Sequence, residues 1–239
     1  MRTFIAVGVL LLLAGCRNES ASPSQQPQER QVPQDRQEPA RAKPRVVFLG
    51  DSLTAGLGLP SDQSYPSLIG KKLKARGYDY EIVNAGVSGD TSAGGVRRLD
   101  WSLEGDVRAL VVALGANDGL RGLPTDDLKR NLQAVLDRAK TRNIPVVLAG
   151  MEAPPNNGPD YTRAFRQVYA DLAKEYPVRF VPFLLLGVAG NAALNQGDGI
   201  HPNERGAEVV ADLVWAELEP VLRHSASAKA PARHAQSPQ

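Results

Sequence analysis

The sequence contains little cysteine, histidine or aromatic side chain. It has one cysteine, Cys16, and three histidines among 239 residues, and aromatic residues make up 5%. A single cysteine excludes an intramolecular disulfide framework and a zinc site built from several cysteines. The histidines, His201, His224 and His234, leave little material for a histidine-rich metal site. We therefore expect a protein that uses no metal and no cofactor.

A strong excess of charge of one sign is also missing. The formal net charge is +2, and residues 45–223 hold 20 Lys/Arg against 22 Asp/Glu. A nucleic-acid binder needs a concentrated basic face on its folded part. Its absence here argues against a nucleic-acid partner, while 42% apolar residues are too many for a disordered chain.

No apolar run is long enough to cross a bilayer, which takes about 20 residues. The run Phe4–Leu13 has ten residues, follows Arg2 and precedes small residues, which is typical of a secretory signal over residues 1–15. The segment Leu13-Ala14-Gly15-Cys16 resembles a bacterial lipobox, whose cysteine is lipidated. An ordinary signal peptide with a chance cysteine is the alternative. Because Arg17 rather than Asp follows, we expect an exported lipoprotein anchored in the outer membrane and facing the periplasm.

Both ends of the chain differ in composition from its middle. Residues 17–44 contain five prolines and six glutamines and almost nothing apolar. Such a segment cannot bury enough surface to offset the entropy of ordering, so residues 16–44 are predicted to be a lipidated cysteine with a solvated tether. Residues 224–239 are rich in Ala, Ser and Pro and are predicted to be a disordered tail. One domain over residues 45–223 remains.

Within that domain, short apolar runs alternate with helical patterns. The runs lie at residues 46–49, 81–83, 109–114, 144–149 and 178–181, and are typical of buried parallel strands. Apolar stripes at helical spacing cover residues 128–139, 161–172 and 207–222. Thr125 and Asn203 are the expected caps of the first and third helices. The alternation predicts a three-layer α/β/α sandwich with a central parallel sheet.

Ser52 follows the first predicted strand by two residues, in Gly50-Asp51-Ser52-Leu53. Ligands of parallel sheets bind beyond the carboxyl ends of the strands, so this hydroxyl could be a nucleophile; a helix N-cap is the alternative. A serine nucleophile needs a base and a group that orients the base. The domain's one histidine, His201, stands three residues after Asp198 on a short loop. Taken singly, Asp198 could be a turn former and His201 a histidine packed beside a helix start.

Acyl transfer also needs donors for the developing oxyanion. Two loops could supply them, one with the backbone N–H of Gly86 and the other with the side-chain amide of Asn117. Asn and Gly are also common in tight turns, which is the alternative for each loop.

Four segments together resemble the blocks of the SGNH (GDSL) serine hydrolases. They are Gly50-Asp51-Ser52-Leu53, the glycine block around Gly86, Gly115-x-Asn117-Asp118 and Asp198-x-x-His201. The resemblance covers residues 45–223 and is greatest to the bacterial periplasmic branch with thioesterase, arylesterase and lysophospholipase activity. It implies a flavodoxin-like fold, with Ser52 as nucleophile, His201 as base and Asp198 as its orienter. It further implies an oxyanion hole of Ser52 N–H, Gly86 N–H and Asn117 Nδ2.

The expected substrate is a small acyl ester or lysolipid, hydrolysed through an acyl-enzyme by a monomer. Leu120, Leu123 and Pro154 are the candidate walls for an acyl chain of short to medium length, although such residues are also ordinary core or loop packing. Two other functions remain open at this point. One is a carbohydrate O-acetyl esterase on the same fold, and the other is a non-catalytic envelope lipoprotein that binds a ligand.

Overall fold

A computed structural model describes residues 42–227 and contains one parallel sheet of five strands. The strand order is β2-β1-β3-β4-β5, so β1, β3 and β4 lie inside the sheet and β2 and β5 at its edges. The strands are β1 (Arg45–Gly50), β2 (Glu81–Gly86), β3 (Val107–Ala113), β4 (Val146–Ala149) and β5 (Arg179–Val181).

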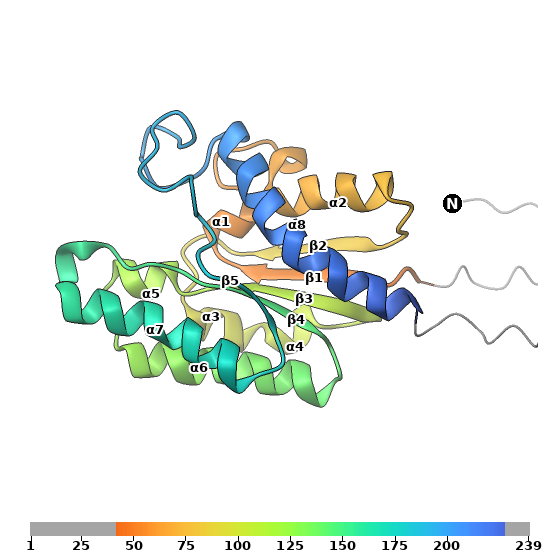
Figure 1. Ribbon diagram of the computed structural model, residues 1–239, viewed down its shortest axis with the longest axis horizontal. Coiled ribbons are helices and arrows are strands. Elements are labelled where there is room, and N and C mark those ends of the chain that lie inside the picture. The colour runs from red at the N-terminus through yellow and green to blue at the C-terminus, as the bar shows by residue number, and fades with distance from the viewer. Residues whose placement is uncertain (1–41, 228–239) are drawn as a thin grey trace, which may run out of the picture. The chain divides into compact units, whose positions relative to one another are not determined.

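Helices cover both faces of this sheet (Figure 1). The longer ones are α2 (Tyr65–Ala75), α6 (Thr125–Thr141), α7 (Pro159–Glu175) and α8 (Glu204–Ser227). The short ones are α1 (Ser52–Ala55), α3 (Ser92–Arg97), α4 (Leu99–Ser102), α5 (Ala116–Leu120) and the 3-10 turns η1 (Ser61–Gln63) and η2 (Pro155–Asn157). Helices α2 and α8 pack together on one face, and α3, α6 and α7 on the other. The predicted three-layer α/β sandwich is therefore confirmed.

Burial follows each strand's place in the sheet. The runs Val46–Leu49 and Ala109–Ala113 are fully buried, because both faces are covered by helices and both edges are paired. Edge strand β2 is only partly buried. This explains why the apolar runs of β1 and β3 were clear in the sequence, while β2 showed a shorter one.

The register brings the functional loops to one edge. Gly50 at the end of β1 pairs with Gly86 of β2 and with Ala113 of β3. These three strands therefore stop level with one another, and the segments that follow them emerge side by side. Ser52 and Asn117 lie in two of these segments.

The two predicted helix caps have different outcomes. Asn203 is confirmed, since its Oδ1 accepts the Gly206 N–H at 3.0 Å at the start of α8. Thr125 was wrong as a cap: it is the first residue of α6, and Pro124 precedes it without a side-chain hydrogen bond. A proline N-cap has no capping oxygen, so the acidic residues Asp126 and Asp127 in the first turn favour this helix end instead.

Several predictions fall outside the described residues. The signal over residues 1–15, Cys16 and most of the tether are among them, as is the tail from residue 228. Helix α8 continues through Ser227, past the predicted domain end at residue 223. Among residues 42–227, no helix combines the length and apolarity that a membrane span requires.

Candidate active site

Ser52 is held at the carboxyl end of β1 by the chain reversal into α1. Asp51 caps α1, and its Oδ1 accepts the Leu53 N–H at 3.0 Å. Ser52 is therefore the first residue of the helix rather than its cap, and its hydroxyl is not used in capping. Gly50 makes the reversal possible, because a Cβ there would lie 1.9 Å from Thr54 Oγ1.

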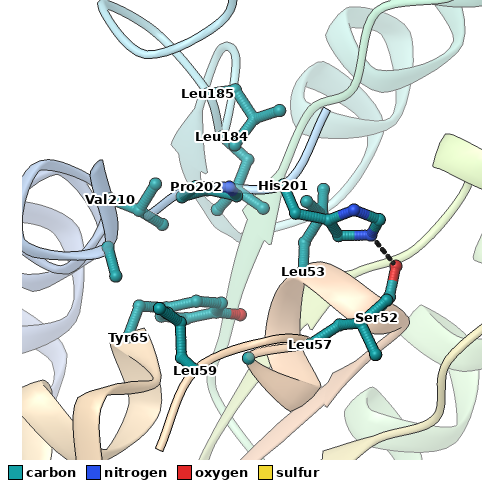
Figure 2. A pocket seen from close by; sticks show the side chains of 12 residues that line it. Ser52, Leu53, Leu57, Leu59, Tyr65, Leu184, Leu185, His201, Pro202 and Val210 are labelled. Atoms are coloured by element: carbon teal, nitrogen blue, oxygen red, sulfur yellow. Dashed lines mark hydrogen bonds between the residues drawn. The ribbon is translucent and has the colours of Figure 1, made fainter. Parts of the chain in front are cut away.

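The side chains of Ser52, His201 and Asp198 form one chain of hydrogen bonds. His201 Nε2 lies 2.9 Å from Ser52 Oγ, and His201 Nδ1 lies 2.6 Å from Asp198 Oδ2. Figure 2 shows the imidazole and the serine hydroxyl facing one another. With the imidazole proton on Nδ1, the ring donates to the carboxylate and its Nε2 is free to accept the Ser52 proton. This arrangement can activate a serine nucleophile.

The carboxylate of Asp198 is itself fixed by the loop that carries it. Its Oδ1 accepts the backbone N–H groups of Ile200 at 2.9 Å and His201 at 3.0 Å. The hydrogen bond from the His201 ring, followed by those two N–H groups, holds the pKa of Asp198 below its ordinary value. The carboxyl group is thus ionised near neutral pH and can stabilise an imidazolium.

The loop before α8 is braced against the end of α1. Gln196 donates its backbone N–H to His201 O at 2.8 Å. The side-chain amide of Gln196 donates to Leu57 O at 2.7 Å and to Pro202 O at 2.9 Å. Because Leu57 lies just beyond α1, Gln196 ties the histidine loop to the serine segment. Gln196 was not among the predicted site residues, since its contact with Leu57 O joins residues 139 positions apart.

Asn117 lies beside this chain, at the start of α5. Its Nδ2 donates to Asp90 O at 2.9 Å, and the same nitrogen is 3.5 Å from Asp51 Oδ2. The first bond is strong and the second is too long to be strong. One amide N–H is therefore bound in place, while the other is available to a substrate oxygen.

Gly86, the expected partner of Asn117, is occupied elsewhere. Its N–H donates to Asn84 Oδ1 at 3.0 Å. A Cβ at Gly86 would lie 2.2 Å from Ala55 N, so the glycine lets β2 approach α1. The Gly86 N–H is thus paired within its own loop, and the lack of a side chain lets β2 pack closely on α1.

Gly89, three residues further on, has the features expected of a donor. Its φ is +82°, and a Cβ there would meet nothing within 4 Å. Its carbonyl accepts from Arg121 Nη2 at 2.9 Å, whereas its N–H donates to no partner within residues 42–227. The next residue, Asp90, is the one that holds Asn117.

Two buried carboxyl groups lie behind the site. Asp51 is fully buried, and burial raises its pKa to about 6. Asp118 accepts from the backbone N–H and the hydroxyl of Ser92 at 2.7 and 2.6 Å, which fastens the Asn117 segment to α3. No group of three or more His, Cys, Asp and Glu residues that could hold a metal is present within residues 42–227.

Two cavities flank Ser52 and His201. The larger has a volume of about 340 Å³ and includes Asn117 in its wall. The smaller, of about 10 Å³, is the one in Figure 2. The apolar side chains of the larger cavity are those of Leu53, Ala116, Leu120, Met151, Ala153, Pro154, Phe183, Leu185, Ala189 and Ile200. It therefore offers an apolar space next to the serine hydroxyl.

Two of the three predicted wall residues line a cavity beside Ser52, and the third does not. Leu120 and Pro154 line the larger cavity. Leu123 lines neither of these two cavities. Its backbone N–H donates to Asp118 O at 3.0 Å and its carbonyl accepts from Tyr161 at 2.8 Å. Leu123 thus closes the turn after α5 rather than lining the cavity.

The chain is similar to known ester hydrolases. A model described as the GDSL-like Lipase/Acylhydrolase family matches residues 48–209. The chain is 43% identical over 178 residues to "Esterase TesA" of Pseudomonas aeruginosa, covering 74% of this chain and 89% of the relative. It is 36% identical over 186 residues to "Thioesterase 1/protease 1/lysophospholipase L1" of Escherichia coli K12, covering 77% and 88%.

A solved structure shares the fold as well. It is the psychrotrophic esterase EstA from Pseudoalteromonas, in a structure inhibited by monoethylphosphonate, with a TM-score of 0.71 and 32% identity. The match covers 76% of this chain and 100% of that one. Because the family model spans more than half of the sequence, the chain belongs to the GDSL (SGNH) lipase/acylhydrolase family and is an ester hydrolase.

Proposed function

We propose that the chain hydrolyses carboxylic esters and thioesters in two steps through an acyl group on Ser52. His201 takes the Ser52 proton as the hydroxyl attacks the acyl carbonyl, and then protonates the leaving alcohol or thiol. Water activated by the same histidine releases the acid, and Asp198 orients the imidazole throughout. The unbroken chain of hydrogen bonds from Asp198 through His201 to Ser52 carries this proposal. General-base assistance of this kind contributes about 10²–10⁴ in rate.

The oxyanion is assigned to three donors, Ser52 N–H, Gly89 N–H and Asn117 Nδ2. Ser52 is the first residue of α1, where helix N–H groups lack an intrahelical acceptor. Gly89 is chosen over Gly86 because its N–H is unpaired within the described residues and it adjoins Asp90, which holds Asn117. Each such donor is worth about 10²–10³ in rate.

The acyl group is assigned to the larger cavity, with a preference for short to medium chains. Small-molecule pockets of about 300–1,000 Å³ with apolar walls are usual in proteins, and this cavity is about 340 Å³. Leu120, on α5, and Pro154, in the segment after β4, are both wall residues of this cavity. Small acyl esters, lysophospholipids among them, are the proposed substrates, and the chain is proposed to act on them as a monomer.

Initial rates on p-nitrophenyl esters from acetyl to palmitoyl test the proposal, with Ser52→Ala as the control. Activity should be greatest on medium chains and should disappear in Ser52→Ala. Activity on the acetyl ester alone would instead point to a carbohydrate O-acetyl esterase. Turnover that survives in Ser52→Ala, or no turnover on any chain length by folded protein, would reject the assigned nucleophile and substrate class.

The site of action is proposed to be the periplasmic face of the outer membrane, through a lipid on Cys16. The support is the sequence Leu13-Ala14-Gly15-Cys16 and the Arg17 that follows it. In bacterial cells, the full chain should sediment with outer membranes, and Cys16→Ser should move it to the soluble or inner-membrane fraction. An unchanged distribution of Cys16→Ser would reject the anchor.

A further inference from the structure

Arg98 makes three short hydrogen bonds to three different segments near the active site. It links α3 to α4, and its side chain is only 16% exposed. Its Nη2 donates to Gly50 O at 2.7 Å, its Nη1 to Ala85 O at 2.6 Å and its Nε to Asp90 Oδ2 at 2.6 Å. One planar guanidinium thus connects the end of β1, the end of β2 and the loop that follows β2.

The three acceptors lie at the ends of β1 and β2 and in the loop after β2, where the sheet supplies few hydrogen bonds to the backbone. Strand β2 is an edge strand, so part of its backbone faces away from the ladder, and Ala85 O is paired by Arg98 instead. Gly50 is the last residue of β1 and lies two positions before Ser52. Arg98 therefore sets the position of the loop after β2 relative to the serine segment.

Asp90 connects Arg98 to the proposed oxyanion donors. Its carboxylate pairs with Arg98, and its own exposure is 18%. Its backbone carbonyl accepts the Asn117 amide at 2.9 Å, and its neighbour in sequence is Gly89. Gly94 makes room for the carboxylate, since a Cβ there would lie 2.4 Å from Asp90 Oδ1. A shift of Asp90 would displace both donors together.

We propose that Arg98, acting through Asp90, is a positioning residue that holds Gly89 and Asn117 in the geometry of the oxyanion hole. This inference rests on the proposed function. Oxyanion donors accelerate a reaction only when they are already in place as charge develops. A displacement of about 1 Å can cost about 10²-fold in rate. Lys could retain the charge at position 98 but cannot bond three divergent acceptors in one plane.

The test compares Arg98→Lys and Asp90→Asn with the parent enzyme on one p-nitrophenyl ester, measuring kcat and KM separately. Both variants should lower kcat by about 10–100-fold and leave KM within about twofold, because the contacts that Arg98→Lys removes and the ion pair that Asp90→Asn reduces to a neutral acceptor act on the transition state. Arg97→Lys is the matched control, since Arg97 is the exposed neighbour in sequence, and its kcat should equal that of the parent.

A double-mutant cycle with Asn117→Ala separates positioning from general stability. In that background Arg98→Lys should lower kcat by no more than about fivefold, because one of the two donors that Arg98 helps to hold has already been removed and only the Gly89 contribution is left to lose. A purely structural role predicts the same factor in both backgrounds. If Arg98→Lys does not fold, as judged by its circular dichroism, Asp90→Asn takes its place in the cycle.

Three results would overturn the inference: kcat within twofold of the parent in Arg98→Lys and Asp90→Asn, an effect confined to KM, or equal factors in the two backgrounds. These results differ from a failure of the proposed function. In that case, the parent enzyme itself would show no Ser52-dependent turnover. A parent that depends on Ser52 combined with an unaffected Arg98→Lys would reject the positioning role alone.

Discussion

The reactivity proposed for Ser52 depends on neighbours that come from separate segments of the chain. His201 and Asp198 arrive from the loop before α8, and Asn117 from the start of α5. Base assistance is worth about 10²–10⁴, and each oxyanion donor about 10²–10³. Since the donors together contribute at least as much as the base, the placement of Asp90 and Asn117 matters as much as the His201 contact.

The pKa of Asp51 leads to a prediction about stability and pH. Burial raises this pKa from 3.8 to about 6, so the folded protein binds the proton more tightly than the unfolded chain does. The contribution of Asp51 to stability therefore falls as pH rises from about 4 to 6 and stays low above that range. Linkage makes this unfavourable contribution about 2 kcal/mol larger at pH 7.5 than at pH 4.5.

Asp51→Asn removes the ionisation but keeps an oxygen that can accept the Leu53 N–H. We compare the melting temperature of the variant with that of the parent at each pH. The advantage of the variant over the parent should be about 4–8 °C larger at pH 7.5 than at pH 4.5. Asp62→Asn, at an exposed position, is the control and should give the same difference at both pH values. A difference for Asp51→Asn that does not grow with pH would contradict the assignment.

At the scale of elements, the contact of β2 with α1 positions the serine. Gly86 allows this contact, because a Cβ there would lie 2.2 Å from Ala55 N and 2.8 Å from Thr54 C. Both are backbone atoms, so a side-chain rotation cannot relieve the clash.

Gly86→Ala should therefore destabilise the fold by about 1–3 kcal/mol and lower its melting temperature by several degrees. Gly197→Ala is a suitable control, since a Cβ there meets nothing within 4 Å and its φ is not positive. Equal melting temperatures for Gly86→Ala and the parent would show that α1 can shift away at little cost.

The elements differ in how readily the sequence predicts them. The buried strands and the helices with apolar stripes were predicted because burial on both faces, or on one helical face, leaves a periodic signal. Helix α2 carries such a signal in Tyr65, Ile69 and Leu73 but was not among the predicted helices. Helix α3 leaves none, since it has six residues and two of them are glycines.

The site was predictable where chemistry determines the residue type. The segments that hold Ser52, Asn117, Asp198 and His201 do lie together at one edge of the sheet. Choosing between Gly86 and Gly89 required the structure, because the direction of a backbone N–H depends on a turn with φ of +82° and on a bond to Asn84. Arg98 was not predicted for a similar reason, as its three acceptors lie 8 to 48 positions away.

At the scale of the whole molecule, exposed apolar side chains gather in the segments that follow the strands. Five of the six large hydrophobic side chains that are exposed within residues 42–227 belong to loops and short helices after strands, namely Leu57, Val87, Leu120, Leu186 and Ile200. Trp101, on α4, is the other. Leu120 and Ile200 line the larger cavity and Leu57 the smaller one, which fits the proposal that this surface binds acyl chains.

Covalent labelling shows whether Ser52 is the nucleophile. The protein is treated with a p-nitrophenyl alkylphosphonate, which leaves a stable phosphonyl group on an activated serine. Intact-protein mass and peptide mapping should show one adduct, on Ser52, rising in step with the loss of esterase activity, and none in Ser52→Ala. Activity lost without modification of Ser52, or an adduct on another residue in its place, would contradict the account.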